Sequence, residues 1–138
     1  MNDEKPVSFL SREQALDLAV IGERARKRLC SFSGQQVGFD AASVQLLDEW
    51  IDDYLGETQN PPEETRLLWT AFLGELFRRR HEGWWAFRDG DLVVVCPKGG
   101  GEFRVVDLNQ QVDRRIAAGM SESLAYFYNL TRVELKLG

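Results

Sequence analysis

The stretch TRLLWTAFLGELFRRRHEGWWAF, residues 65–87, decides the fold of this chain. In a helix that turns about 100° per residue, its apolar side chains would cover most of the circumference. These side chains are Leu67, Leu68, Trp69, Ala71, Phe72, Leu73, Leu76 and Phe77. A helix that is apolar nearly all round is normally buried by neighbours on several sides. We therefore expect a central buried helix, with Asn60 and Pro61 at its start and the cations of residues 78–80 at its end.

Gly74 lies inside this predicted helix, where a glycine costs about 1 kcal/mol relative to alanine. It is tolerated where another part of the backbone packs closely against the helix. We expect that close neighbour to be either the strands that follow or the helix predicted around residues 44–54.

An antiparallel sheet is expected directly after the helix. Residues 84–87 have the composition of a strand, and Asp89-Gly90 is a strong hairpin signal because both turn positions tolerate a positive φ. Residues 92–96 and 103–106 supply the second and third strands. The predicted fold is therefore α+β, with the central helix packed on a three-stranded antiparallel meander.

Two helices are predicted before the central helix and two after the meander. Their starts are marked by side chains that cap helices, namely Ser11, Asp40, Asp107 and Ser121. The basic residues 24–28 are expected at the far end of the first helix, where cations favour the helix dipole.

Three segments have weaker signals. Residues 1–10 are expected to be a flexible lead-in to a single domain spanning residues 1–138. Residues 37–39 are a candidate for a short extra strand. Residues 133–137 alternate between apolar and polar, so they are predicted to be a final strand or a frayed end.

Composition narrows the classes of function. The chain has 138 residues, 43% of them hydrophobic, and its net charge of −5 argues against a nucleic-acid binder. It has no signal-peptide pattern and no apolar run long enough to cross a membrane, so we expect a cytoplasmic protein. Cys30 and Cys96 are expected to be reduced thiols. His81 is the only histidine, and with two isolated cysteines it lacks the ligand spacing of a zinc site, so no metal, cofactor or catalytic residue is predicted.

Residues 40–64 carry acidic side chains but no lysine or arginine. On the predicted helix within this segment, one face holds Asp48, Glu49, Asp52 and Asp53. Three interpretations stay open: a solvated surface, a binding face for a basic protein partner, or a divalent metal site. The metal site is the weakest of the three, because these residues lack the fixed loop spacing of calcium sites.

Glu75 interrupts the apolar pattern of the central helix. It either forms a structural ion pair with Arg79, four residues on, or lies at the floor of a pocket. A raised pKa of Glu75 without a contact to Arg79 would favour the pocket. Trp84 and Trp85 should point to opposite sheet faces, one into the core and the other lining a ligand groove or covering the sheet edge.

Four short motifs resemble a set of small, mostly uncharacterised bacterial α+β proteins. They are LGE at residues 73–75, a basic helix end at 78–80, GWW at 83–85 and an aromatic pair at 127–128. The resemblance covers roughly the C-terminal two-thirds of the chain. It implies a fold and no activity, although some such domains resemble immunity proteins encoded beside toxins.

Two hypotheses of function follow. The first is a non-catalytic protein-interaction domain, immunity-like, that presents Asp48, Glu49, Asp52 and Asp53 to a basic partner. The second is a small ligand-binding or hydrolytic domain with a pocket near Glu75, Arg79, Trp84 and Trp85.

Overall fold

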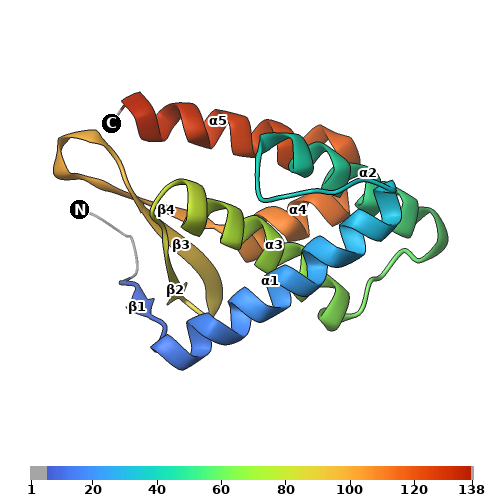
Figure 1. Cartoon of the computed structure of the whole chain (residues 1–138). Helices are drawn as coiled ribbons and strands as arrows, with labels where there is room; N and C mark the ends of the chain where they lie inside the picture. The colour runs from blue at the N-terminus through green and yellow to red at the C-terminus, as the bar shows by residue number, and fades with distance from the viewer. Residues whose placement is uncertain (1–5, 138) are drawn as a thin grey trace.

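A computed structural model describes residues 6–137 (Figure 1). The elements in chain order are β1 (Ser8–Phe9), α1 (Arg12–Ser33), α2 (Ala41–Glu57), α3 (Glu63–Arg80), β2 (Trp84–Arg88), β3 (Asp91–Pro97), the 3-10 turn η1 (Gly99–Gly101), β4 (Phe103–Asp107), α4 (Leu108–Ala118), the 3-10 turn η2 (Gly119–Glu122) and α5 (Leu124–Leu137). The fold is α+β, as predicted, with helices that flank both sides of a four-stranded antiparallel sheet.

The central helix, α3, is buried as predicted. Every residue from Leu68 to Phe77 is buried, which follows from the apolar residues around its whole circumference. The prediction for its start was wrong. The helix begins at Glu63, and Pro62 occupies the N-cap position without any side-chain hydrogen bond, so Asn60 does not cap it. Acids in the first turn and arginines in the last favour the helix dipole instead.

The predicted meander is present, and it gains a fourth strand at one edge. Asp89 and Gly90 have φ angles of 54° and 84°, which fits the hairpin predicted between β2 and β3. In the additional strand β1, Phe9 pairs with Ala86 of β2. The prediction of a flexible lead-in is therefore wrong for β1, whereas residues 1–5 lie outside the described residues.

The helices surround the sheet unevenly (Figure 1). α3 packs on the inner face of the sheet, and α1 runs along α3. α5 packs along α2 and also lies beside β4, where Glu134 is 3.1 Å from Arg104. Leu10 continues β1, because its N–H donates to the carbonyl of Trp85 at 3.1 Å. The sheet therefore contacts both the segment before α1, at Leu10, and α5, at Glu134.

The close approach expected at Gly74 is confirmed. A Cβ added there would lie 2.0 Å from Cη2 of Trp85 on β2 and 2.7 Å from a methyl group of Leu108. The neighbouring element is the meander, one of the two alternatives, but the atoms closest to Gly74 belong to side chains and not to the backbone as expected. Only a residue without a side chain leaves room for the Trp85 indole against α3 at this position.

The first helix and the loop after it differ from the predictions. α1 continues to Ser33 and ends at Gly34, whose φ is 70°, so the basic residues 24–28 lie inside the helix. Residues 37–39 form no strand. Their backbone groups bond to side chains instead: Arg26 donates to the carbonyl of Val37 at 2.8 Å, and Arg80 donates to that of Phe39 at 2.7 Å.

The C-terminal segment is helical throughout its described part. Gly119 ends α4 as predicted, but η2 follows, so the hydroxyl that accepts from the first turn of α5 is that of Ser123, not Ser121. The buried residues of this helix are Leu124, Tyr128, Thr131 and Leu135. Spacings of three and four residues bury one face of a helix, so the strand, one of the two alternatives for residues 133–137, is wrong.

Candidate functional site

Strand β2 places its two tryptophans on opposite faces of the sheet, as predicted. Trp85 is 3% exposed and faces α3, where its indole N–H donates to Glu75 at 2.9 Å. Trp84 is 66% exposed and points to the other face, which we call the outer face. One tryptophan therefore belongs to the core, and the other is available to a binding partner.

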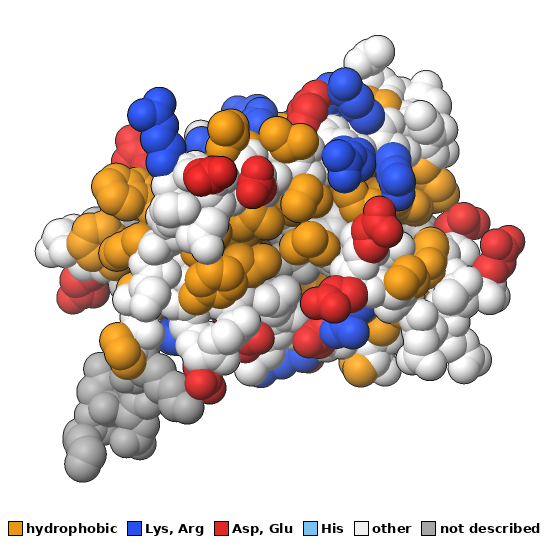
Figure 2. Space-filling model, turned by 90° about the horizontal axis from the view of Figure 1, so that it is seen from below, with side chains coloured by type: hydrophobic (Ala, Val, Ile, Leu, Met, Phe, Trp, Pro, Cys, Tyr) orange, Lys and Arg blue, Asp and Glu red, His pale blue; other side chains and the backbone are white. Residues whose placement is uncertain are grey.

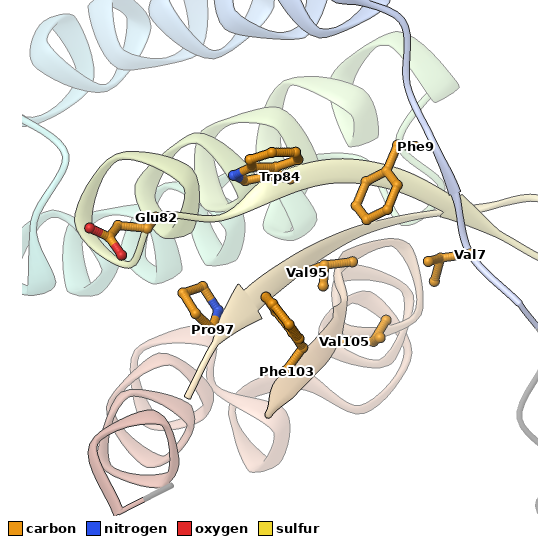
Figure 3. Close-up of a pocket in the computed structure, with 8 residues that line it drawn as sticks. All are labelled: Val7, Phe9, Glu82, Trp84, Val95, Pro97, Phe103 and Val105. Atoms are coloured by element: carbon orange, nitrogen blue, oxygen red, sulfur yellow. The ribbon is translucent and has the colours of Figure 1, made fainter. Parts of the chain in front are cut away.

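Trp84 lines a groove on this outer face, which we call the aromatic groove (Figure 3). Its lining residues are Val7, Phe9, Glu82, Trp84, Val95, Pro97, Phe103 and Val105. The groove has a volume of about 660 Å³, within the range of about 300–1,000 Å³ that is usual for ligand pockets.

The register of the strands brings these side chains together. Trp84 pairs with Val95, which pairs in turn with Val105, so the three form one row across the sheet. Phe103 pairs with Pro97 in the next row. Beneath the rings, Ala86, Val93 and Val95 are buried and form a small apolar cluster separate from the main core. The outer face therefore has an apolar floor of its own.

The aromatic side chains of the groove are poorly covered. Phe9, Trp84 and Phe103 are 57%, 66% and 68% exposed. Phe9 and Trp84 meet edge to face, with ring centroids 5.9 Å apart and an angle of 71° between the planes. Aromatic residues are enriched at protein interfaces, and neighbouring exposed apolar residues mark interaction surfaces, whereas isolated ones do not.

Glu82 is the ionisable residue among those that line the groove, and its backbone is strained. Its φ is 53°, a left-handed conformation that usually falls to glycine. The glycine follows at position 83 because a Cβ there would lie 2.3 Å from Val94. Close packing thus fixes Gly83, and the positive φ falls on Glu82 in the turn between α3 and β2.

Glu75 forms a buried ion-pair network and is not open to a ligand. Its side chain is 0% exposed, and Arg78 donates to both carboxylate oxygens at 2.6 and 2.8 Å. Arg79 donates at 3.3 Å and also stacks on Phe39, its guanidinium carbon 4.1 Å from the ring centroid. Burial alone would raise the pKa of Glu75, but the arginines and the indole N–H of Trp85 hold it below its usual value.

The structure therefore separates the residues of the predicted pocket. Glu75, Arg79 and Trp85 lie on the core side of the sheet, whereas Trp84 lies on the outer face. Trp84 and Trp85 both line a shallow hollow beside the start of α1, but Glu75 and Arg79 do not line it. The lowered pKa of Glu75 and its contact with Arg79 favour the structural ion pair over the pocket floor. Of the four residues, only Trp84 lines the aromatic groove.

Asp48 was expected on the surface and is instead buried, at 3% exposure. One of its oxygens accepts from Nε of Arg115 at 2.8 Å and from the N–H of Leu124 at 3.0 Å. The other accepts from Ser123 Oγ and from the N–H of Ala125, both at 2.9 Å. Asp48 thus balances a buried arginine and caps the N-terminus of α5, so it cannot belong to a partner-binding face.

The other three acids of α2 remain accessible. Glu49 and Asp53 are exposed, and Asp52 is 52% exposed while it accepts from Arg115 at 2.5 Å. Burial alone would lower the pKa of Arg115, but its bonds to Asp48 and Asp52 raise it. Part of the acidic face is therefore neutralised within the protein. Within residues 6–137, no ion pair involves Glu49 or Asp53.

His81 contacts Tyr128 rather than solvent alone. Its Nε2 lies 2.9 Å from the tyrosine hydroxyl, and burial together with nearby cations lowers the pKa of the imidazole.

Among residues 6–137, no three His, Cys, Asp or Glu side chains are grouped so that they could hold a metal ion. None of the described helices is both long and apolar enough to span a bilayer. Cys30 and Cys96 are free thiols.

A second apolar surface lies on α1. Leu16 and Val20 are 63% and 52% exposed, and a shallow hollow of about 380 Å³ runs beside Val20. Figure 2 shows this face with acidic and basic side chains around and between the apolar ones. Three charged residues, Glu23, Arg24 and Lys27, line the hollow. This surface is smaller and more charged than the aromatic groove.

The sequence matches no protein-family model, no curated protein and no solved structure. The resemblance to small bacterial α+β proteins therefore stays a prediction. The candidate site rests on the geometry of the groove alone.

Several groove residues were missed by sequence reasoning. Phe9 and Val7 lie in the segment predicted to be a lead-in, although their alternation, with Ser8 between them, is a strand signal. Phe103 was placed on a strand, but its face was not assigned. Glu82 carries no sequence signal, because its role depends on a turn whose geometry follows from the packing of Gly83.

Proposed function

We propose that this chain is a non-catalytic protein-interaction domain that binds its partner through the aromatic groove. The observation that carries the proposal is the exposure of Phe9, Trp84 and Phe103 along one groove. Aromatic side chains of this kind are the usual anchors of protein interfaces.

The size of the groove indicates what kind of interface it would form. With roughly 150–250 Å² for each aromatic side chain, the exposed parts of the three rings amount to roughly 300–450 Å². At about 25 cal/mol per Å², their burial would contribute about 7–11 kcal/mol. Association itself costs about 4–15 kcal/mol, and a standard interface buries about 800 Å² on each partner. The groove would thus be the anchor of an interface that also includes its rim.

The chemistry of the lining supports binding rather than catalysis. Seven of the eight lining side chains are apolar, and the eighth is the single carboxylate of Glu82. A catalytic site of the acid–base or nucleophilic kind needs at least two cooperating groups within hydrogen-bond reach.

The acidic face of α2 is a second candidate surface, reduced to Glu49, Asp52 and Asp53. It is favoured by the exposure of Glu49 and Asp53 and by the net charge of −5. A basic partner, as for an immunity-like protein, would be attracted to it at low ionic strength. The two candidate surfaces differ in which substitutions should weaken binding of the partner.

Site-specific photo-crosslinking in the native host would test the proposal. A photoreactive phenylalanine analogue at position 84 or 103 should crosslink one and the same protein, whereas the analogue at Tyr126, which is 69% exposed on α5, should not. With that protein purified, Trp84→Ala and Phe103→Ala should each weaken binding at least about tenfold, as expected for anchor residues.

Matched variants distinguish the two surfaces. Tyr126→Ala is the control for an exposed aromatic residue away from the groove, and it should leave the affinity unchanged. Reversal of Glu49 and Asp53 to lysine tests the acidic face. A partner whose affinity falls with the lysine variants and not with Trp84→Ala or Phe103→Ala would overturn the groove as the binding site.

A further inference from the structure

We infer that the aromatic groove takes a basic apolar segment of the partner protein, in which a lysine or arginine beside apolar side chains pairs with Glu82. This inference rests on the proposed function and names the chemistry of the bound segment. It follows from the charge, the backbone and the aromatic residues of the groove.

The charge of the groove is one-sided. Glu82 is the ionisable residue among the eight that line it. Glu82 also borders a neighbouring hollow with Arg12 and Arg78, but within residues 6–137 no ion pair involves its carboxylate. An acidic segment would bring a second carboxylate beside Glu82 while it displaced water from the groove, which is unfavourable. A basic side chain would complement this charge and would suit a protein with a net charge of −5.

The backbone conformation of Glu82 also supports a role of this residue in recognition. At a φ of 53° a glycine would fit without the steric penalty that a Cβ incurs. Strained residues persist where the surrounding structure enforces them, and they cluster at binding sites. A charged side chain at this strained position, on the rim of the groove, is explained if the carboxylate takes part in recognition.

The aromatic residues add a second attraction for a cation. Figure 3 places Glu82 at one end of the groove and Val7 and Phe9 at the other end, with the indole of Trp84 between them. A basic segment that runs from Glu82 along the groove would pass the exposed indole of Trp84, and tryptophan is the best of the aromatic side chains for cation–π contacts. The apolar part of the segment would then follow the floor towards Phe9.

A set of three peptides tests the inference on the full-length protein. The probes are acetyl-Gly-Phe-Leu-X-Leu-Phe-Gly-amide with lysine, norleucine or glutamate at X. Binding is measured by titration calorimetry and mapped by the amide resonances of the strands around the groove. An exposed ion pair is worth at most about fivefold in affinity. We therefore expect the lysine peptide to bind about three- to fivefold more tightly than the norleucine peptide and the glutamate peptide to bind least, with the differences shrinking in high salt.

Variants of Glu82 connect this preference to its carboxylate. Glu82→Gln should abolish the ranking of the three peptides, whereas the control Glu102→Gln, at an exposed acid paired with Lys98 at 4.0 Å, should keep it. Glu82→Gly is a second variant that removes the charge and suits the positive φ, so it should fold at least as stably as the wild type.

The outcomes separate the inference from the proposed function. Peptides that shift the groove resonances with equal affinity would overturn the charge preference and leave the groove as a binding site. A ranking that survives both Glu82 variants would overturn the role of Glu82. If none of the peptides shifts the groove resonances, the inference fails, and failure of the crosslinking at positions 84 and 103 would then remove the proposed function as well.

Discussion

Asp48 offers the most direct test of how the helices are held together. In Asp48→Asn, one oxygen becomes an NH₂ group, yet all four partners of the carboxylate donate hydrogen bonds. The amide can turn its NH₂ towards Ser123 Oγ, which can also accept, but the N–H of Ala125 then loses its acceptor. Arg115 also loses a full negative charge.

The expected loss of stability can be worked from these contacts. Breaking a buried ion pair on one side costs about 3–5 kcal/mol, and loss of a helix cap costs about 1 kcal/mol. Asp52 still accepts from Arg115 at 2.5 Å, and the asparagine keeps one acceptor oxygen, so the lower end applies. We expect Asp48→Asn to lower the free energy of unfolding by about 3 kcal/mol, which corresponds to a fall in Tm of roughly 10 °C.

Urea unfolding followed by circular dichroism measures this loss. Asp53→Asn, an exposed acid on the same helix, is the matched control and should change the free energy by less than about 0.5 kcal/mol. Adding Arg115→Met to Asp48→Asn should restore part of the stability, because the buried guanidinium that lost one of its two carboxylate partners is then gone. Equal stabilities of the Asp48 and Asp53 variants, or strictly additive effects of the double variant, would refute the reasoning.

Three further predictions concern the packed interior. Gly74→Ala should lower the free energy of unfolding, measured in urea, by about 2 kcal/mol, because the overlap of the added Cβ with Trp85 outweighs the better helix propensity of alanine. The control Gly56→Ala places its Cβ where nothing lies within 4 Å, so it should not destabilise the protein. The folded pKa of Glu75 is depressed, so its contribution to stability is present above its usual pKa of 4.5 and is lost as the pH falls through the folded value. The urea midpoint should fall as the pH is lowered through this range, and Glu75→Gln should make this pH dependence weaker. Cys96, whose pKa burial raises to about 12, should react with a thiol reagent only when the protein unfolds, as absorbance after denaturation will show.

The features that the sequence predicts correctly have causes close together in the chain. The buried α3 follows from its own apolar residues, and the β2–β3 hairpin follows from Asp89 and Gly90. Ser11 and Asp40 cap α1 and α2 through residues three positions on. Gly74 led to a prediction of close tertiary packing, because a glycine inside a helix has a cost that some close neighbour must explain.

Several features that the sequence predicts wrongly depend on partners far away in the sequence. On α2, Asp48 has the same local pattern as Glu49, Asp52 and Asp53, and its burial is decided by Arg115, 67 residues later. β1 has only two residues, and its pairing with β2 spans most of the chain. Residues 37–39 have strand-like composition, but side chains of other elements take up their backbone groups.

Of the residues that line the aromatic groove, only Trp84 was a site candidate in the sequence, and the others are identified by the structure. The alternation of Trp84 and Trp85 places one indole outside. Whether an outward ring is an isolated exposed residue or part of a groove depends on which strands are its neighbours. That pairing brings Phe9 and Phe103 to the same face from segments that are remote in the sequence.

The two faces of the sheet differ in what the fold requires of them. On the inner face, Trp85 fills the space above Gly74 and bonds to Glu75, so its identity is fixed by packing and by a hydrogen bond. On the outer face, Trp84 and Phe103 leave about two-thirds of their surface in water, so folding gains little from their size. Smaller polar residues would serve the sheet as well and would expose less apolar surface. Large exposed rings beside an acidic residue with a strained backbone are thus better explained by a bound segment than by the stability of the fold.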